Sequence, residues 1–151
     1  MGQCQRMADD WKRLFTAAGA ARKKAHAPYS NFSVGAALLL DDGSIVSGCN
    51  VENASYGLTV CAERNAVGAM VLAGRTPVAC AIVVDSAVPT PPCGMCRQVL
   101  AEFAGPGFAV RSRTLSGEEA AYTLGELLPH TFTRSFLTPR SPPPKKTRKA
   151  R

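Results

Sequence analysis

Two short cysteine-containing segments, far apart in the chain, constrain this protein more than any other feature of its sequence. Cys61 stands two residues before Glu63, and a C-x-x-C pair, Cys93 and Cys96, follows Cys61 by 32 and 35 positions. Cysteine thiolates can supply all three protein ligands of a zinc ion whose fourth position stays open for water, while a glutamate that is not a ligand moves protons. The fold must therefore bring both segments to one point, and the pattern predicts a catalytic zinc site of the deaminase type.

Other uses of these cysteines explain less of the pattern. A closed structural zinc site needs a fourth ligand, and none of the candidates Cys49, His26 and His130 has ligand spacing. A redox C-x-x-C pair leaves Cys61 and Glu63 unexplained. The N-terminus has no secretory pattern, so we expect a cytoplasmic protein, in which disulfides are rare. We therefore favour the open catalytic site.

The net charge of +7 is concentrated at one end of the chain. Residues 140–151 hold six of the 18 Lys and Arg residues and no acid, which leaves 12 basic against 11 acidic residues elsewhere. A nearly neutral body disfavours a nucleic-acid partner, because such proteins carry a basic face. No apolar run approaches the roughly 20 residues that span a bilayer. We expect a flexible extension over 1–10, one folded domain over 11–139 and a disordered basic tail over 140–151.

The pattern of apolar residues and turn signals predicts an alternation of helices and strands. We expect helices over 11–25, 59–73 and 93–105, strands over 33–40, 44–50, 78–85, 108–113 and 120–124, and a helical turn over 125–129. This order predicts an α/β fold, a three-layer α/β/α sandwich with a mixed sheet of about five strands. Thr59 is the expected N-cap of the second helix. The cysteines then lie in first helical turns, where the helix dipole stabilises thiolates.

Three thiolates on one Zn²⁺ leave a net negative charge that nearby groups must offset. Arg64 and Arg97 each directly follow a site residue and can donate hydrogen bonds to the sulfurs. For Arg97, a surface salt bridge is an equally good explanation. Glu63 is the expected proton carrier: it accepts a proton from the attacking water, passes it to the ring nitrogen and assists the departure of ammonia.

These residues and their surroundings resemble the small homotetrameric zinc-dependent cytidine deaminases, over about residues 11–132. The segments that carry the resemblance are 28–37 (PYSNFSVGAA), 48–57 (GCNVENASYG), 61–64 (CAER), 92–98 (PCGMCRQ) and 126–129 (ELLP) before Phe132. Zinc-deaminase signatures occur with many substrates. The Asn50–Glu52 stretch together with the Phe32 segment is more specific to enzymes that act on nucleosides.

The resemblance implies a role for each matching position. Cys61, Cys93 and Cys96 match the ligands of one Zn²⁺ per chain, and Glu63 matches the catalytic acid and base. The positions that match substrate-binding residues are Asn50 and Glu52 at the ribose hydroxyls, Phe32 and the Ala62 backbone at the base, and Ala54, Tyr56 and Phe132 across a subunit boundary. The implied protein is a cytoplasmic homotetramer with shared sites, which deaminates cytidine and 2′-deoxycytidine to uridine and 2′-deoxyuridine, releasing ammonia, in pyrimidine salvage.

Three other functions remain open at this point. The chain could deaminate another aminopyrimidine, such as a nucleoside antibiotic, which assays of several substrates would distinguish. It could edit RNA or DNA with the help of its basic tail, although the nearly neutral body argues against this. It could also be a zinc-stabilised binding module without chemistry, an alternative that the presence of Glu63 beside a predicted open metal position disfavours.

Overall fold

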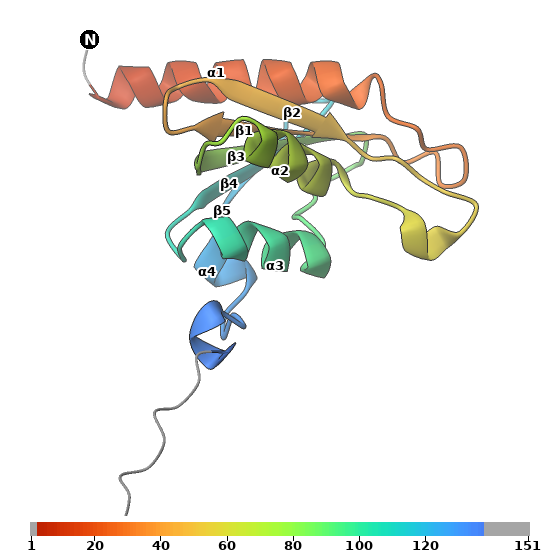
Figure 1. Cartoon of the computed structure of the whole chain (residues 1–151). Coiled ribbons are helices and arrows are strands. Elements are labelled where there is room, and N and C mark those ends of the chain that lie inside the picture. Colours follow the sequence, from red (N-terminus) through yellow and green to blue (C-terminus); the bar gives the residue numbers. More distant parts are fainter. Residues whose placement is uncertain (1–2, 138–151) are drawn as a thin grey trace, which may run out of the picture.

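The computed structural model describes residues 3–137, which form one sheet with helices packed on both of its faces (Figure 1). The elements are α1 (Gln3–Arg22), β1 (Val34–Leu40), β2 (Ile45–Cys49), η1 (Tyr56–Leu58), α2 (Ala62–Leu72), β3 (Pro77–Val84), α3 (Gly94–Phe103), β4 (Ala109–Thr114), β5 (Glu119–Thr123), α4 (Leu124–Leu127) and η2 (Arg134–Leu137). The strand order is β2-β1-β3-β4-β5. Strands β3 and β4 pair in parallel, and the other neighbours are antiparallel. The predicted five-stranded mixed sheet is confirmed.

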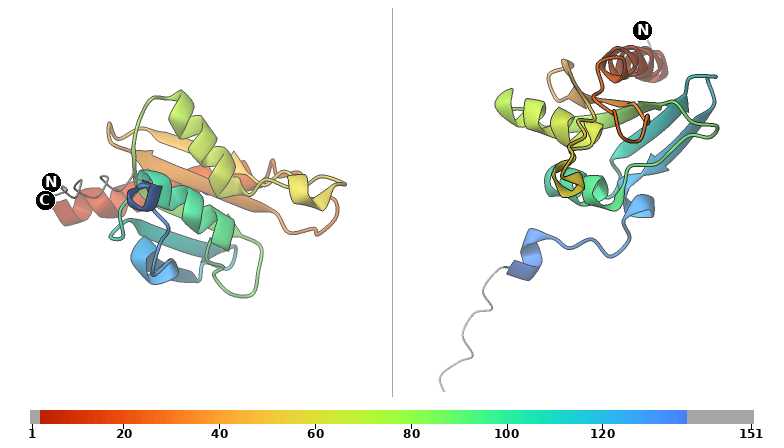
Figure 2. Two further views of the ribbon diagram at one scale, coloured as in Figure 1. Left: turned by 60° about the horizontal axis from the view of Figure 1, so that its bottom comes forward. Right: turned by 90° about the vertical axis from the view of Figure 1, so that its right-hand side faces the viewer.

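The sheet is the middle of three layers. Helix α1 covers one face, and α2 and α3 cover the other (Figures 1 and 2). Successive side chains of a strand point to opposite faces, so a strand between two helical layers must be apolar on both. In β1, Ala36, Leu38 and Leu40 belong to the core on the α2 and α3 side. Ala37 and Leu39 belong to the core beneath α1. The predicted α/β/α sandwich is confirmed.

Helix α1 is longer at its start than the sequence indicates. It begins at Gln3, whereas the apolar spacing predicts a start near Trp11, and it ends at Arg22. Residues 5–9 are exposed. A helical segment without a buried apolar face has no 3.6-residue spacing of apolar residues, so the sequence does not indicate this part of the helix. Residues 3–10 of the expected flexible extension are therefore helical.

Two further expectations concern the ends of the chain and the membrane. The expected basic tail over 140–151 lies outside the described residues. Within residues 3–137, no helix combines the length and hydropathy that crossing a bilayer requires.

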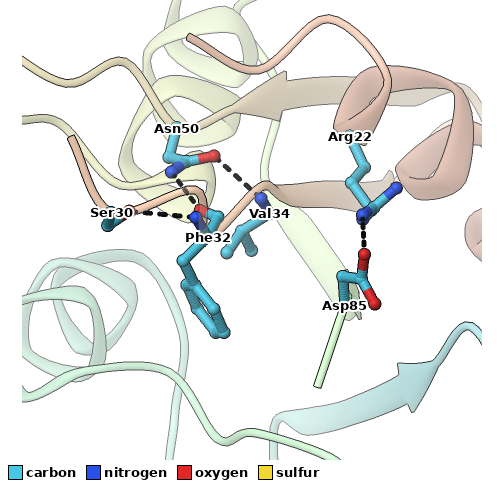
Figure 3. Close-up of polar contacts among 6 residues, drawn as sticks. All are labelled: Arg22, Ser30, Phe32, Val34, Asn50 and Asp85. Carbon is cyan, nitrogen blue, oxygen red and sulfur yellow. Dashed lines mark hydrogen bonds and ion pairs between the residues drawn. The ribbon is translucent and has the colours of Figure 1, made fainter. Parts of the chain in front are cut away.

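Helix α1 is fastened to the sheet near the functional site. A Cβ added to Gly35 would lie 2.0 Å from the carbonyl oxygen of Ala18, so only glycine allows this approach of helix and strand. At the end of the helix, Arg22 donates from Nη2 to Oδ2 of Asp85 over 2.9 Å (Figure 3). Asp85 directly follows β3, whose last residue, Val84, lines the site described below.

Gly48 provides the corresponding close approach between β2 and α2, the helix that carries Glu63. A Cβ at this position would lie 2.5 Å from the amide nitrogen of Ala66 and 2.6 Å from the carbonyl oxygen of Ala62. Both neighbours are backbone atoms, so the helix itself would have to move.

We expect Gly48→Ala to lower the free energy of unfolding by about 1–3 kcal/mol, the usual cost of overpacking. Gly68→Ala is the matched control, because a Cβ there meets nothing within 4 Å on the exposed side of the same helix. That variant should gain about 0.5–1 kcal/mol, since alanine favours a helix more than glycine does. Denaturant unfolding measures both, and equal effects of the two substitutions would contradict the close packing.

Candidate active site

Two helix starts bring the three predicted zinc ligands together. Cys61 is the N-cap residue of α2 and Cys93 the N-cap residue of α3, while Cys96 lies in the first turn of α3. The Sγ atom of Cys93 is 3.7 Å from that of Cys61 and 3.5 Å from that of Cys96. All three sulfurs lie within 4.8 Å of one another. A tetrahedral zinc ion with Zn–S bonds of about 2.3 Å separates its sulfur ligands by about 3.8 Å, so this donor set fits the metal.

The cluster offers three protein ligands and not four. Within residues 3–137, the group of His, Cys, Asp and Glu ligand atoms close enough to share an ion consists of these three cysteines alone. The candidates for a closed structural site, Cys49, His26 and His130, are not members of it. Three thiolates without a fourth protein ligand are typical of a catalytic rather than a structural zinc site.

The surroundings of Cys61 favour its thiolate. Hydrogen bonds from the thiols of Cys96 and Cys93, and then a hydrogen bond and the positive charge of Arg64, lower the pKa of Cys61 to about 5. The hydrogen bond to Cys61 and then burial raise the pKa of Cys96. A metal ligand must be deprotonated, so metal binding at this site must release protons, among them that of Cys96.

The two arginines next to the site act on different groups. Arg64 acts on Cys61, because its proximity and positive charge help to lower the pKa of that thiol, and its Nη2 donates to the carbonyl oxygen of Thr59 over 2.7 Å. Arg97 donates from Nε to the carbonyl of Pro92 over 2.7 Å and from Nη1 to that of Leu127 over 2.8 Å. Both of these Arg97 contacts are with backbone carbonyls, so Arg97 holds the peptide that precedes Cys93 in place.

Glu63 is buried beside the sulfurs, with 5% of its surface exposed. Burial and, less strongly, the negative charge of Cys61 raise the pKa of its carboxyl. A carboxyl with a raised pKa can both accept and donate a proton near neutral pH, as a proton carrier must.

A cavity of about 250 Å³ opens onto this cluster. Cys61, Cys93 and Glu63 line it together with four residues predicted to bind substrate, namely Phe32, Asn50, Glu52 and Ala62. Seven residues for which the sequence predicted no role in binding also line it: Ser30, Val34, Thr59, Ile82, Val84, Thr90 and Pro91. Ile82 and Val84 lie among the last residues of the buried strand β3, and sites of α/β sheets commonly lie at the carboxyl ends of strands. Their position in the predicted strand therefore could have indicated that they line the site.

Asn50 is held by the backbone of the segment that carries Phe32. Its Oδ1 accepts a hydrogen bond from the amide of Val34 over 2.8 Å, and its Nδ2 donates to the carbonyl of Phe32 over 2.8 Å (Figure 3). The side chain is buried, and its two hydrogen bonds connect it to the backbone just before and at the start of β1. A primary amide has two donor hydrogens, so one hydrogen of Nδ2 is left for a ligand.

The remaining predicted site residues lie outside the cavity. Tyr56 borders an adjoining hollow, which it shares with Tyr29, Ser30, Glu52 and Thr59. Tyr56 is 74% exposed, and its ring packs edge-on against that of Tyr29 with 5.8 Å between the ring centroids. Ala54 and Phe132 line neither hollow and are exposed as well, and the Phe132 ring stacks on Phe136. Within one chain, the structure therefore does not bring these three residues together with Glu63.

Comparison with known proteins shows what this arrangement is similar to. Residues 9–110 match the family model described as the cytidine and deoxycytidylate deaminase zinc-binding region. A cytidine deaminase of Halalkalibacterium halodurans is 50% identical over 125 residues, which cover 82% of this chain and 95% of that protein. A cytidine deaminase of Mycobacterium tuberculosis is 45% identical over 128 residues, 82% of this chain and 90% of that protein. The crystal structure of cytidine deaminase from Burkholderia pseudomallei superposes with a TM-score of 0.76 at 48% identity, over 80% of this chain and 98% of that one.

Proposed function

The chain belongs to the cytidine and deoxycytidylate deaminase family, and from this premise we propose that it hydrolyses cytidine and 2′-deoxycytidine to uridine and 2′-deoxyuridine, releasing ammonia. One observation carries the proposal: a buried carboxyl, Glu63, lies beside a three-thiol cluster in a cavity that polar side chains also line. Cys61, Cys93 and Cys96 would hold one Zn²⁺ per chain.

The proton transfers fall to Glu63. When bound, zinc lowers the pKa of a water in the position that no protein atom fills. Glu63 accepts a proton from the attacking water as its oxygen bonds to C4 of the pyrimidine, and it delivers that proton to N3. Glu63 then takes the proton of the new C4 hydroxyl and passes it to the amino group, so that the C4 carbonyl forms as the C4–N bond breaks and ammonia leaves. The raised pKa of Glu63 suits both directions of transfer.

The polar residues of the cavity bind the nucleoside. Glu52 and the free hydrogen of Asn50 Nδ2 hydrogen-bond the sugar hydroxyls, and Phe32 packs on the base. Support comes from the cavity lining, where these three side chains accompany Glu63. The Ala62 backbone holds the pyrimidine, and its burial at the start of α2 keeps that peptide next to the cysteine cluster.

The sugar subsite predicts selectivity against nucleotides. The Glu52 carboxylate has a lowered pKa, first because Ser30 and then because the Tyr29 amide hydrogen-bonds it, so it is negative at neutral pH. Like charges placed close together cost several kcal/mol, and we expect kcat/KM for cytidine monophosphate to lie at least about 100-fold below that for cytidine. Steady-state assays of cytidine, 2′-deoxycytidine, cytosine and the monophosphate measure this directly. Comparable values for cytidine and its monophosphate would contradict the assigned pocket, and no turnover of cytidine would contradict the function.

We further propose a homotetramer in which neighbouring subunits complete one another's sites. Ala54, Tyr56 and Phe132 are exposed and lie outside the cavity of their own chain, as residues that serve a neighbour must. Light scattering after gel filtration tests this, with an expected mass of about 64 kDa, four times the 15.9 kDa of one chain. A monomer with full activity would contradict it. We also propose a role in pyrimidine salvage, because the proposed substrates and products are pyrimidine nucleosides, and a cytoplasmic location.

A further inference from the structure

The Ser30 hydroxyl connects two substrate-binding residues that come from different parts of the chain. Its hydrogen is donated to Oε1 of Glu52, and its oxygen accepts a hydrogen bond from the amide of Phe32 over 3.0 Å (Figure 3 shows the latter contact). A hydroxyl offers one donor hydrogen and two acceptor positions, so both contacts form at once. Neighbouring hydrogen bonds in such a chain polarise and strengthen one another.

The acceptor positions of Glu52 show what this contact achieves. A carboxylate has about four acceptor positions, two on each oxygen. Both positions on Oε2 are taken by backbone amides, that of Tyr29 over 2.9 Å and that of Ser30 over 3.3 Å. The Ser30 hydroxyl takes one position on Oε1. A single position on Oε1 is left for a donor in the cavity, and the carboxylate has little freedom to rotate away from it.

Phe32 is fixed from the same network. Its amide donates to Ser30, and its carbonyl accepts from Asn50, so hydrogen bonds hold the peptide on both sides of the aromatic residue (Figure 3). The residue is 37% exposed, and these two backbone hydrogen bonds fix the peptide from which its ring projects.

We propose that Ser30 is a positioning residue of the sugar subsite, whose hydroxyl directs one oxygen of Glu52 at a sugar hydroxyl and couples that carboxylate to the Phe32 peptide. The inference rests on the proposed function, because it assumes that Glu52 binds the sugar. Ser30 lines both the cavity and the adjoining hollow, and it would act through Glu52 and Phe32 without taking part in the chemistry.

The test compares Ser30→Ala with wild type on cytidine and on 2′,3′-dideoxycytidine, which lacks the 2′- and 3′-hydroxyls that Glu52 is proposed to bind and keeps the 5′-hydroxyl. Loss of a hydrogen bond to a charged group should lower kcat/KM for cytidine by at least about ten-fold, mainly through KM. The dideoxynucleoside cannot use the Glu52 contact, so its kcat/KM should fall by less than about three-fold. Ser30→Thr keeps the hydroxyl and should restore the preference for cytidine.

Ser33→Ala is the matched control, because it removes the same atom from the same segment at a residue that does not line the cavity. It should leave both substrates unaffected. An equal loss on both substrates in Ser30→Ala, or no loss on either, would overturn the inference while wild-type turnover of cytidine still supports the function. A Ser30→Thr variant that behaves like Ser30→Ala would also overturn it. A wild-type protein inactive on cytidine would overturn the proposed function and the inference with it.

Discussion

The Glu63→Gln variant is expected to keep its zinc and to lose at least about 100-fold in kcat on cytidine, with losses up to about 10,000-fold in the range of general acid–base catalysis. Glutamine has nearly the same shape but cannot carry a proton from the attacking water to the ring. Glu63 is buried beside the cysteine cluster, so the substitution acts at the proposed reaction site. The measurement is the steady-state rate of deamination together with the zinc content of the same sample.

Glu102→Gln serves as the control for this variant. Glu102 lies in α3, the helix that carries Cys96, but it is exposed and does not line the cavity. Its substitution removes the same charge from the chain and should leave kcat unchanged. A Glu63→Gln protein that holds zinc and keeps most of its turnover would show that Glu63 is not the proton carrier.

The Cys93→Ala variant is expected to lose zinc and to lower the rate of deamination at least about 1,000-fold. Two thiolates alone are too few protein ligands to hold the zinc ion, because catalytic zinc sites use three. Without the metal, the pKa of the attacking water keeps its ordinary high value. The zinc-loaded wild type should also be the more stable protein, because a metal that binds the folded state shifts unfolding by mass action. Zinc content, deamination rate and thermal unfolding of the two proteins measure the three effects.

Cys49→Ala is the corresponding control. Cys49 is half-buried at the end of β2 and is not a member of the three-thiol group. Its substitution should change neither the zinc content nor the rate. Full zinc occupancy and normal turnover in Cys93→Ala would contradict the assigned ligand set.

The sequence was sufficient to predict the three layers of the fold, because the central strands of the sheet are apolar along nearly their whole length. The strand residues from Gly35 to Leu40 and from Ala79 to Val84 are buried on both faces, and such apolar runs are visible without a structure. The three-cysteine cluster was equally accessible, since thiols at ligand spacing with a neighbouring glutamate have few other uses.

The start of α2 shows where local preference misleads. Thr59 is a favourable N-cap by residue type, yet the helix is capped by Cys61. The reason lies in other contacts of the loop: Thr59 closes η1 through its amide to Tyr56, and Val60 pairs with Val51. These contacts keep the chain extended until Cys61, and they place this thiol at the helix end.

The contacts that hold the residues predicted to bind substrate could not be read from the sequence. Asn50 and Ser30 owe their places to hydrogen bonds with residues that are distant in sequence or belong to the backbone, and no spacing rule describes them. Ser30 stands inside the 28–37 segment singled out from the sequence, but that segment pointed only to Phe32. Tyr56 and Phe132 lie outside the cavity of their own chain, so their predicted roles depend on how copies of the chain assemble.

Zinc K-edge X-ray absorption on the purified, active protein tests the central claim most directly. Three sulfur ligands at about 2.3 Å and one oxygen ligand near 2.0 Å are the expected result, because Cys61, Cys93 and Cys96 bind the ion and water takes the fourth position. Four sulfur ligands, or three sulfurs with a histidine nitrogen, would mean a closed structural site and would contradict the account.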